Sequence, residues 1–424
     1  MSEQREVPKG RLERVFRLAK LGADAGIGLV AGRSADVLAE QAARTLSNLR
    51  GLAAKVGQMA STLEGVLPET WEAPVSAALS QLRDSTTTSP LDQIVAVIEQ
   101  ELGATVSSLF AEFDPIPIAS ASIGQVHRAR LGDGRQVAVK VQHPGIEQAI
   151  GHDLLNVRLL ERLAGSIAPK GANVDEVFTE VSTRLREELD YRIEAKHVQA
   201  FAALHQNEAH AVVPNVVPER STKRVITTML FEGAKLDDIL SYASTVERQG
   251  YAETLFRFEF RSILVAGMFN ADPHSGNFLF GPSPQVAFLD FGCVQTLSEQ
   301  RRMLIRAVHH AAINRDERQF AQSVRELLET NGGRYEQFMV DFTRRAFEPI
   351  FASPFHLTSE YLRGLVDFVR DAKMTLLRQR GPISAFPPEL ALMNRLQFGF
   401  YSLLSKLDVQ VDYSALEQEI LAAT

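Results

Sequence analysis

The stretch FNADPHSGNFLFGPSPQVAFLDFG, residues 269–292, sets three polar side chains at the ends of short apolar runs. Asp272 and Asn277 form the pattern D-x-x-x-x-N, and Asp290 opens the D-F-G that ends the stretch. The runs NFLF and QVAFLDFG, separated by the turn GPSP, predict two short strands joined as a hairpin. Such a hairpin would place both carboxylates at one end of the fold.

Each of these polar residues also has an ordinary structural explanation. Asp272 and Asn277 could stabilise a loop through Asx-type side-chain bonds. Asp290 could be a turn-forming residue at a strand end. His274 suggests a metal site, but no second histidine lies nearby in the sequence. We therefore expect His274 to hold the loop by a hydrogen bond to the main chain.

A lysine in an apolar strand changes the balance between these explanations. Lys140 lies within VAVKV, whose period-two alternation predicts a strand. Burying a lysine there costs free energy unless its charge is paired with an acidic group or binds a ligand. The alternative to a functional role is a lysine on an edge strand whose ammonium group reaches water. Lys140, then D-x-x-x-x-N, then D-F-G is the order in which protein kinases position a nucleotide. In that arrangement Lys140 holds the α- and β-phosphates, Asn277 and Asp290 bind Mg²⁺, and Asp272 orients the attacking group.

The segment before this lysine differs from the glycine loop of ordinary kinases. No G-x-G-x-x-G precedes Lys140, and no A-P-E follows the D-F-G. The corresponding segment is ASASIGQVH, residues 119–127. Alanine and serine reach positive φ less readily than glycine, so we expect this loop to hold phosphates differently, with seryl hydroxyls as donors. A tight strand turn of small residues is the alternative. The residues predicted to contact the nucleotide are Ala119, Ser120, Ala121, Ser122, Lys140 and Met229.

The order of apolar patterns predicts an α+β chain in three parts. Helical periodicity dominates residues 11–66, and the polar segment RDSTTTSP at 83–90 is a plausible boundary. A small β-rich lobe with inserted helices follows, and then a larger helical lobe that contains the hairpin. The predicted parts are 1–88, 89–231 and 232–424.

Within the β-rich part, the sequence predicts a helix to about Leu102 and then three short strands after Pro115. Helical segments are expected over about 146–165 and 173–207, followed by two more strands within 215–233. A short connection near Leu230–Gly233 would lead into the helical lobe.

Composition excludes several classes of protein. The chain has 424 residues, 45% apolar and 23% charged, which is ordinary for a globular protein with a large core. A net charge of −7 argues against bulk nucleic-acid binding. The single cysteine, Cys293, forms no disulfide framework and indicates a reducing compartment. The polar N-terminus fits no signal peptide, and no apolar run reaches a membrane span. We expect a cytoplasmic protein that associates at most peripherally with a membrane.

Four stretches resemble one family. They are KVGQ at 55–58, ASASIGQVH at 119–127, EELDYRIEA at 187–195, and DPHSGN with LDFG. Together they make the sequence similar to the UbiB/ADCK (AarF-domain) family of atypical kinase-like proteins, in its soluble branch. The resemblance implies a protein-kinase-like two-lobed fold with an N-terminal helical K-x-G-Q extension. Ser120 stands where the family usually has alanine and Ser275 where it usually has proline, and neither change removes a chemical group.

The resemblance also implies roles for individual side chains. Lys55 and Gln58 would belong to the K-x-G-Q helix, which packs over the cleft where a protein substrate would otherwise dock. Glu188 and Asp190 would form its E-x-D motif.

Glu194 would be the acidic residue that pairs with Lys140. Glu187, Asp190 and Glu194 would share one face of a continuous helix, because they are three and four residues apart. One acidic helix could then serve both Lys55 and Lys140, although a solvated charged face is the favoured explanation for Glu187.

The function implied by the resemblance is that of a Mg²⁺-dependent ATPase or small-molecule kinase in isoprenoid-quinone or other prenyl-lipid metabolism. Its catalytic residues would be Asp272, Lys140 and Glu194, and its cofactors ATP/ADP and Mg²⁺. Expected partners are a prenyl lipid or phenolic small molecule, a membrane surface and lipid-biosynthesis enzymes, with no nucleic acid. The sequence leaves open whether the protein forms a homodimer. The alternatives are a nucleotide-gated lipid-binding module, suggested by the amphipathic segment 11–30, and an ordinary Ser/Thr protein kinase.

Overall fold

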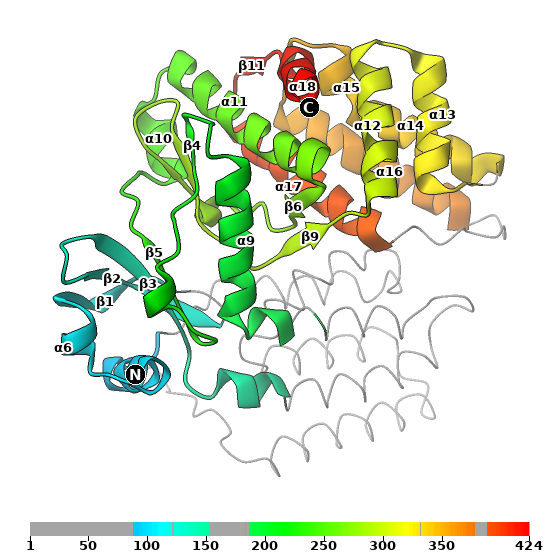
Figure 1. The fold of residues 1–424 in the computed structure, drawn as a ribbon. Helices are drawn as coiled ribbons and strands as arrows, with labels where there is room; N and C mark the ends of the chain where they lie inside the picture. Colours follow the sequence, from blue (N-terminus) through cyan, green and yellow to red (C-terminus); the bar gives the residue numbers. More distant parts are fainter. Residues whose placement is uncertain are drawn as a thin grey trace, which may run out of the picture. The chain divides into compact units, whose positions relative to one another are not determined.

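The computed structural model of the chain describes residues 88–120, 123–151, 183, 186–330, 332–377 and 388–423 (Figure 1). The chain is an α+β protein, as predicted, and it divides into two compact units. Unit 1 comprises residues up to Tyr191 together with Arg220–Thr227, and unit 2 comprises Arg192–Glu219 together with Thr228–Thr424. The boundaries expected after residues 88 and 231 stay predictions.

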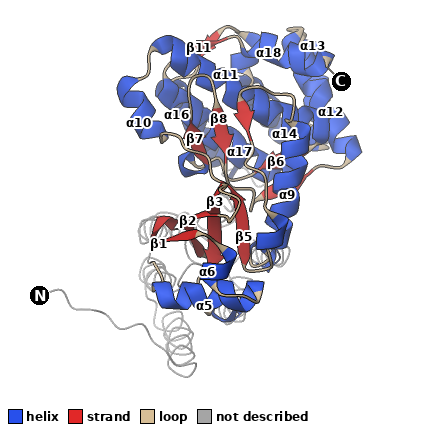
Figure 2. Cartoon of the chain, turned by 60° about the vertical axis from the view of Figure 1, so that its left-hand side comes forward, coloured by secondary structure: helices blue, strands red, loops and turns tan. Residues whose placement is uncertain are grey.

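The described part of unit 1 is built on one four-stranded sheet (Figure 2). Its strands, in spatial order, are β1 (Glu112–Ser120), β2 (Gly124–Arg130), β3 (Gln136–Gln142) and β5 (Val225–Met229). Two helices precede the sheet in sequence, α5 (Leu91–Leu102) and the short α6 (Val106–Leu109). The predicted helix to Leu102 and three strands are therefore confirmed, although the first strand begins at Glu112, before Pro115, and extends to Ser120.

Strand β3 explains how an apolar strand can carry a lysine. Val137, Val139 and Val141 point to the buried face and are 0% exposed, whereas Lys140 is half-buried on the opposite face. Helix α5 packs against β3, and its buried residues include Ile94. Burying a valine or isoleucine side chain contributes about 1.5–3 kcal/mol, so this alternation fixes the face on which Lys140 lies.

The prediction of two strands within 215–233 is only half right. The segment forms β5, but its first half holds the short helical turn η2 (Pro218–Arg220) and one isolated bridge between Val216 and Thr228. Pro218 has no N–H to give to a ladder, which disfavours a strand there. The turn between η2 and β5 is held by the Thr227 hydroxyl, which donates to the main-chain oxygen of Arg220 at 2.7 Å.

The expected continuous acidic helix is also interrupted. Leu189 and Asp190 are not helical, and α9 (Tyr191–Leu204) begins only at Tyr191. The Tyr191 N–H donates instead to the main-chain oxygen of Lys223 at 2.9 Å. The argument that Glu187, Asp190 and Glu194 share one helical face is therefore wrong, because the residues before Tyr191 do not continue the helix.

The described part of unit 2 is mainly helical and holds three small sheets. The sheets pair β4 (Ala211–Val212), β8 (Val286–Phe288) and β7 (Phe278–Phe280) in that order, β6 (Met268–Asn270) with β9 (Val294–Thr296), and β10 (Phe355–His356) with β11 (Gln410–Val411). The predicted hairpin is confirmed, since β7 and β8 are antiparallel. Besides α9, the helices are α10 (Leu236–Tyr242), α11 (Thr245–Arg261), α12 (Glu299–Ile313), α13 (Glu317–Leu328), α14 (Gly333–Ala346), α15 (Glu348–Phe351), α16 (Ser359–Leu377), α17 (Pro388–Leu407) and α18 (Tyr413–Ala422). Within the described ranges, every helix is too short or too polar to cross a bilayer.

Helix α11 ends in an irregular turn that leads into the polar loop after β6. The turn η3 (Ser262–Ala266) is π-helical, and Gly267 closes it at φ 63°. Two arginines of α12 bind its carbonyl groups: Arg302 donates to Val265, and Arg306 donates to Leu264 at 3.1 Å. These bonds satisfy carbonyls that a widened helical turn leaves without intrahelical partners.

The core of unit 2 encloses a carboxyl group on α11. Glu259 is 7% exposed, and its Oε1 has no hydrogen-bond partner among the described residues. Burial penalises the charged form and raises the pKa of Glu259 to about 8. The folded protein therefore holds a proton on Glu259 at neutral pH.

We expect the Glu259→Gln substitution to remove a pH dependence of stability. Because the folded pKa lies above the unfolded one, the contribution of Glu259 is fully present below about pH 4.5 and is lost as the pH rises to about 8. The slope in that window is about 1.4 kcal/mol per pH unit. We expect the free energy of unfolding of Glu259→Gln, measured with urea, to increase relative to that of the parent protein between pH 6 and pH 8. The control Glu253→Gln should show no such change. An equal difference at the two pH values would contradict the prediction.

Candidate functional site

The polar residues after β6 form a compact loop in unit 2. Asp272 lies two residues beyond β6, and the short turn η4 (Ser275–Asn277) brings Asn277 back toward it. The Asn277 Nδ2 donates to the Asp272 main-chain oxygen at 3.0 Å and lies 3.5 Å from Asp272 Oδ2. Since the amide nitrogen is used in this bond, Oδ1 is the Asn277 side-chain atom that could bind a cation.

The end of the hairpin joins this loop to Asp290. The Leu289 N–H donates to the main-chain oxygen of Asn277 at 3.0 Å, and Asp290 is the next residue. The structure thus brings Asp272, Asn277 and Asp290 to the same end of the hairpin. All three side chains are half-buried.

One amide, which the sequence did not single out, connects the two aspartates. Asn270 ends β6, and its Nδ2 donates to the main-chain oxygen of Asp290 at 2.7 Å. Its Oδ1 accepts from the Asp272 N–H at 3.2 Å. Asn270 therefore fixes the main chain at both aspartates. Only a side chain with a donor and an acceptor can do this, and a lone asparagine at a strand end carries no periodic signal that would reveal it.

The D-F-G turn depends on a residue without a side chain. The Gly292 N–H donates to Asp290 Oδ1 at 2.8 Å, which folds the carboxylate back over the turn. A Cβ atom on Gly292 would lie 3.2 Å from that same oxygen and 4.0 Å from Glu194 Oε2. A side chain at position 292 would therefore crowd the Asp290 carboxylate, whereas 4.0 Å is an ordinary contact distance to Glu194.

Helix α9 packs against the same turn. Glu194, which is 6% exposed, lies near Gly292, and the Phe201 ring lies 4.8 Å from the Phe291 ring, centroid to centroid. His197 Nδ1 lies 3.1 Å from the Phe291 main-chain oxygen, so His197 donates there. Sequence reasoning missed His197. The predicted pairing of Glu194 with Lys140 stays a prediction, because the two residues belong to different units.

In unit 1, Lys140 lies over an aromatic ring. Its Nζ is 5.2 Å from the centroid of the Tyr191 ring, within range of a cation–π interaction. Tyr191 is 1% exposed. A Cβ atom on Gly124 would lie 2.5 Å from the Val141 main-chain oxygen and 2.6 Å from the Tyr191 hydroxyl. Gly124 thus lets the start of β2 lie close to β3 and to the Tyr191 hydroxyl. Tyr191 is a further residue that the sequence did not indicate.

The loop predicted to bind phosphates is anchored by buried polar residues. Gln125 Oε1 accepts from the Ser89 N–H at 2.7 Å, and Gln125 Nε2 lies 2.8 Å from His127 Nε2. His127 is fully buried, which lowers its pKa. Ala119, which is exposed, and Ser120, which is half-buried, do not lie in a loop as predicted but end β1, where they pair with Val126 and Gln125. Ala121 and Ser122 lie outside the described residues.

The remaining predicted residues divide between described and undescribed parts. Glu188 and Asp190 are half-buried in unit 1, and Lys55 and Gln58 lie outside the described residues. Met229 ends β5 and is half-buried, with its N–H bonded to the main-chain oxygen of Asn215 at 2.9 Å. The nucleotide and motif roles of these residues stay predictions.

His274 holds the loop, as expected. Its Nδ1 accepts from the Gly276 N–H at 3.0 Å.

The oxygen atoms of the loop suit a hard cation whose remaining coordination positions are filled by a second ligand. No three His, Cys, Asp or Glu side chains within the described ranges form a metal-binding group. Asp290 and Asn277 instead supply carboxylate and amide oxygens, the ligand atoms that Mg²⁺ prefers when phosphate oxygens fill its other positions. The residues therefore fit a Mg²⁺–nucleotide complex better than a permanent metal ion.

Fold and site together define a kinase-like protein. A lysine on β3, a D-x-x-x-x-N loop and a D-F-G turn stand in the kinase order. The sequence model of the ABC1 atypical kinase-like domain matches residues 81–324. The chain belongs to this family, and the predicted UbiB/ADCK resemblance is confirmed.

Curated relatives and a solved structure agree with this assignment. The atypical kinase COQ8 of Saccharomyces cerevisiae is 30% identical, over 98% of this chain and 86% of its own length. The atypical kinase COQ8B of Rattus norvegicus is 28% identical, over 99% and 82%. The structure of Rv3197 from Mycobacterium tuberculosis, in complex with erythromycin, is 26% identical with a TM-score of 0.64, covering 97% of this chain and 98% of that one. The predicted kinase-like fold is confirmed.

For the ATP hydrolysis that we propose under the next heading, we expect Asn270→Ala to lower kcat by about 10- to 100-fold, because one side chain fixes the main chain at both Asp272 and Asp290. Each lost hydrogen bond is worth only about 1 kcal/mol of stability, so the fold should survive. Steady-state hydrolysis and thermal unfolding measure the two effects. Asn314→Ala, which removes the amide at the end of α12, is the matched control. Equal activity in both variants would show that Asn270 does not position the site.

Proposed function

We propose that the protein is a Mg²⁺-dependent ATPase or small-molecule kinase. The observation that carries this proposal is the assembly of Asp272, Asn277 and Asp290 through hydrogen bonds at one end of the hairpin. Their carboxylate and amide oxygens form half of a cation site that nucleotide phosphates would complete. Membership of the ABC1 atypical kinase-like family supports the same chemistry.

Each residue has a distinct task in this proposal. Asp290 and Asn277 would hold Mg²⁺, which neutralises charge on the β- and γ-phosphates. Asp272 would accept a hydrogen bond from the attacking water or hydroxyl and orient it toward the γ-phosphate.

In unit 1, Lys140 would hold the α- and β-phosphates, with Glu194 as its ion-pair partner. Contact with the Tyr191 ring restrains the long lysine side chain before a ligand binds. Segment 119–122, whose first two residues end β1 opposite Val126 and Gln125, would donate to phosphate from its main chain and its seryl hydroxyls.

The acceptor is proposed to be water or a small molecule rather than a protein. The K-x-G-Q segment, outside the described residues, would restrict access of a peptide. A relative of known structure holds erythromycin, which supports a small-molecule ligand. Family membership supports an isoprenoid-quinone precursor or another prenyl lipid as the substrate class, and peripheral association with a membrane as the place of action. The nucleotide-gated lipid-binding alternative rests on the segment 11–30, also outside the described residues.

We expect Asp290→Asn to reduce Mg²⁺-dependent ATP hydrolysis by at least 100-fold, since the Mg²⁺ site would lose its carboxylate. Asp367→Asn, on the exposed face of α16, is the matched control and should keep the parent rate. Chelation of Mg²⁺ should abolish turnover in the parent protein. Equal turnover in the parent and Asp290→Asn proteins would rule out the proposed mechanism.

A lipid-extraction assay with prenyl-lipid liposomes separates the two functions. Hydrolysis that is unaffected by the lipid, together with extraction that requires ATP binding but not hydrolysis, would favour the lipid-binding module instead.

A further inference from the structure

The residue after the proposed catalytic aspartate lies against a glycine of a distant helix. A Cβ atom built on Gly399, in α17, would lie 2.4 Å from Pro273 Cγ and 3.5 Å from Pro273 Cβ and Cδ. Carbon atoms in contact are normally about 3.5–4.0 Å apart, so no side chain fits between α17 and this proline ring. Pro273 follows Asp272 directly and its ring is rigid, so its position is coupled to that of Asp272.

Glycine is a costly choice at this position. Gly399 lies well inside α17, where glycine destabilises a helix by about 1 kcal/mol relative to alanine. It does not adopt a positive φ, so backbone conformation does not require it. The close approach of Pro273 is the feature of its surroundings that explains it.

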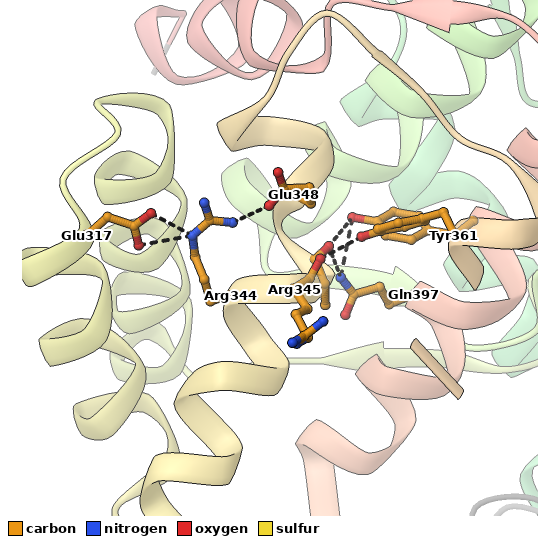
Figure 3. A network of polar contacts seen from close by, with 8 residues as sticks. Glu317, Arg344, Arg345, Glu348, Tyr361 and Gln397 are labelled. Atoms are coloured by element: carbon orange, nitrogen blue, oxygen red, sulfur yellow. Dashed lines mark hydrogen bonds and ion pairs between the residues drawn. The ribbon is translucent and has the colours of Figure 1, made fainter. Parts of the chain in front are cut away.

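The opposite face of α17 is held by hydrogen bonds. Gln397 Nε2 donates to the main-chain oxygen of Ala346 at 3.3 Å, and the Tyr401 hydroxyl donates to the same oxygen at 3.1 Å (Figure 3). Gln397 and Tyr401 are four residues apart and share one face, whereas Gly399, at about 100° per residue, lies on the other face. Helix α17 is therefore held between the end of α14 and the catalytic loop.

The end of α14 is itself firmly placed. The Tyr361 hydroxyl donates to the main-chain oxygen of Arg345 at 2.7 Å (Figure 3). The Arg345 guanidinium lies 4.4 Å from the centroid of the Phe368 ring. The neighbouring Arg344 pairs with Glu317 at 2.8 Å and with Glu348 at 2.5 Å. These contacts join α13, α14, α15 and α16, so α17 has a fixed support behind it.

We propose that α17 is the support against which the catalytic loop is positioned, and that Gly399 is a positioning residue for Asp272. The inference rests on the proposed function for its effect on turnover. A methyl group at 399 must displace Pro273 by on the order of 1 Å, because α17 is anchored on its other face. A displacement of that size at a catalytic group can cost about 100-fold in rate.

The test is a double-mutant cycle between Gly399→Ala and Pro273→Ala. Gly399→Ala should lower kcat for ATP hydrolysis at least 10-fold and leave the affinity for Mg²⁺–ATP within about threefold. Adding Pro273→Ala removes the ring that the new methyl group meets, so the double variant should recover at least fivefold over Gly399→Ala alone. Gly364→Ala, in α16, is the matched helical control, since a Cβ there meets nothing within 4 Å.

A second measurement separates failure of this inference from failure of the proposed function. Amide hydrogen exchange in the catalytic loop should speed up in Gly399→Ala, at Asp272, Gly276 and Asn277, and return toward the parent rate in the double variant. This readout needs no turnover. If the parent protein does not hydrolyse ATP, the proposed function fails while exchange still tests the role of α17.

The outcomes that overturn the inference are definite. Additive effects of the two substitutions on kcat and on exchange would show that Gly399 and Pro273 do not act through each other. If Gly399→Ala does not fold, the single variant Pro273→Ala tests the proposal. It should speed amide hydrogen exchange in the catalytic loop and leave exchange in α17 unchanged. Unchanged exchange in that variant would overturn the proposal.

Discussion

The two hydrogen bonds of a single amide hold together the segments on which the site in unit 2 depends. Asn270 accepts from the main chain at Asp272 and donates to the main chain at Asp290, so the end of β6 is bonded directly to the residues that follow β8. The bond from Leu289 to Asn277 ties the same segments a second time. In stability terms each bond is worth only about 1 kcal/mol, but their effect is positional, because they fix the relative placement of two carboxylates.

Several positions around the site require glycine because a side chain would not fit there, and not because the backbone has an unusual conformation. Gly124, Gly292 and Gly399 do not adopt positive φ, yet a Cβ atom on each would meet a neighbouring atom. At Gly124 the neighbours are a strand carbonyl and a tyrosine hydroxyl, at Gly292 a carboxylate, and at Gly399 a proline ring. The protein thus positions these groups by letting backbone and side chains approach closely.

Elements whose apolar residues recur with a regular period could be predicted from the sequence, because one face of each is buried. Contacts that depend on single atoms could not be predicted. The alternation of VAVKV placed Lys140 opposite three buried valines, and the apolar runs around GPSP gave the hairpin that unites Asp272 and Asp290. Asn270 and Gly399 act through an amide and a missing Cβ, which leave no periodic signal. The acidic helix was wrong because charge spacing says nothing about whether the backbone stays helical, and here it does not before Tyr191.

The π-helical turn at the end of α11 limits how this part of the chain can change in length. Turn η3 is π-helical, so its hydrogen bonds join residues five apart where those of an α-helix join residues four apart. It leads through Gly267 into the strand that ends at Asn270. Removing one residue would restore a regular helix but rotate everything after it by about 100°. Arg302 and Arg306 would then face the wrong carbonyl groups. Insertions and deletions should therefore be tolerated in the outer loops of unit 2 and excluded between α11 and β6, so the number of residues in this connection is as much a part of the site as its side chains.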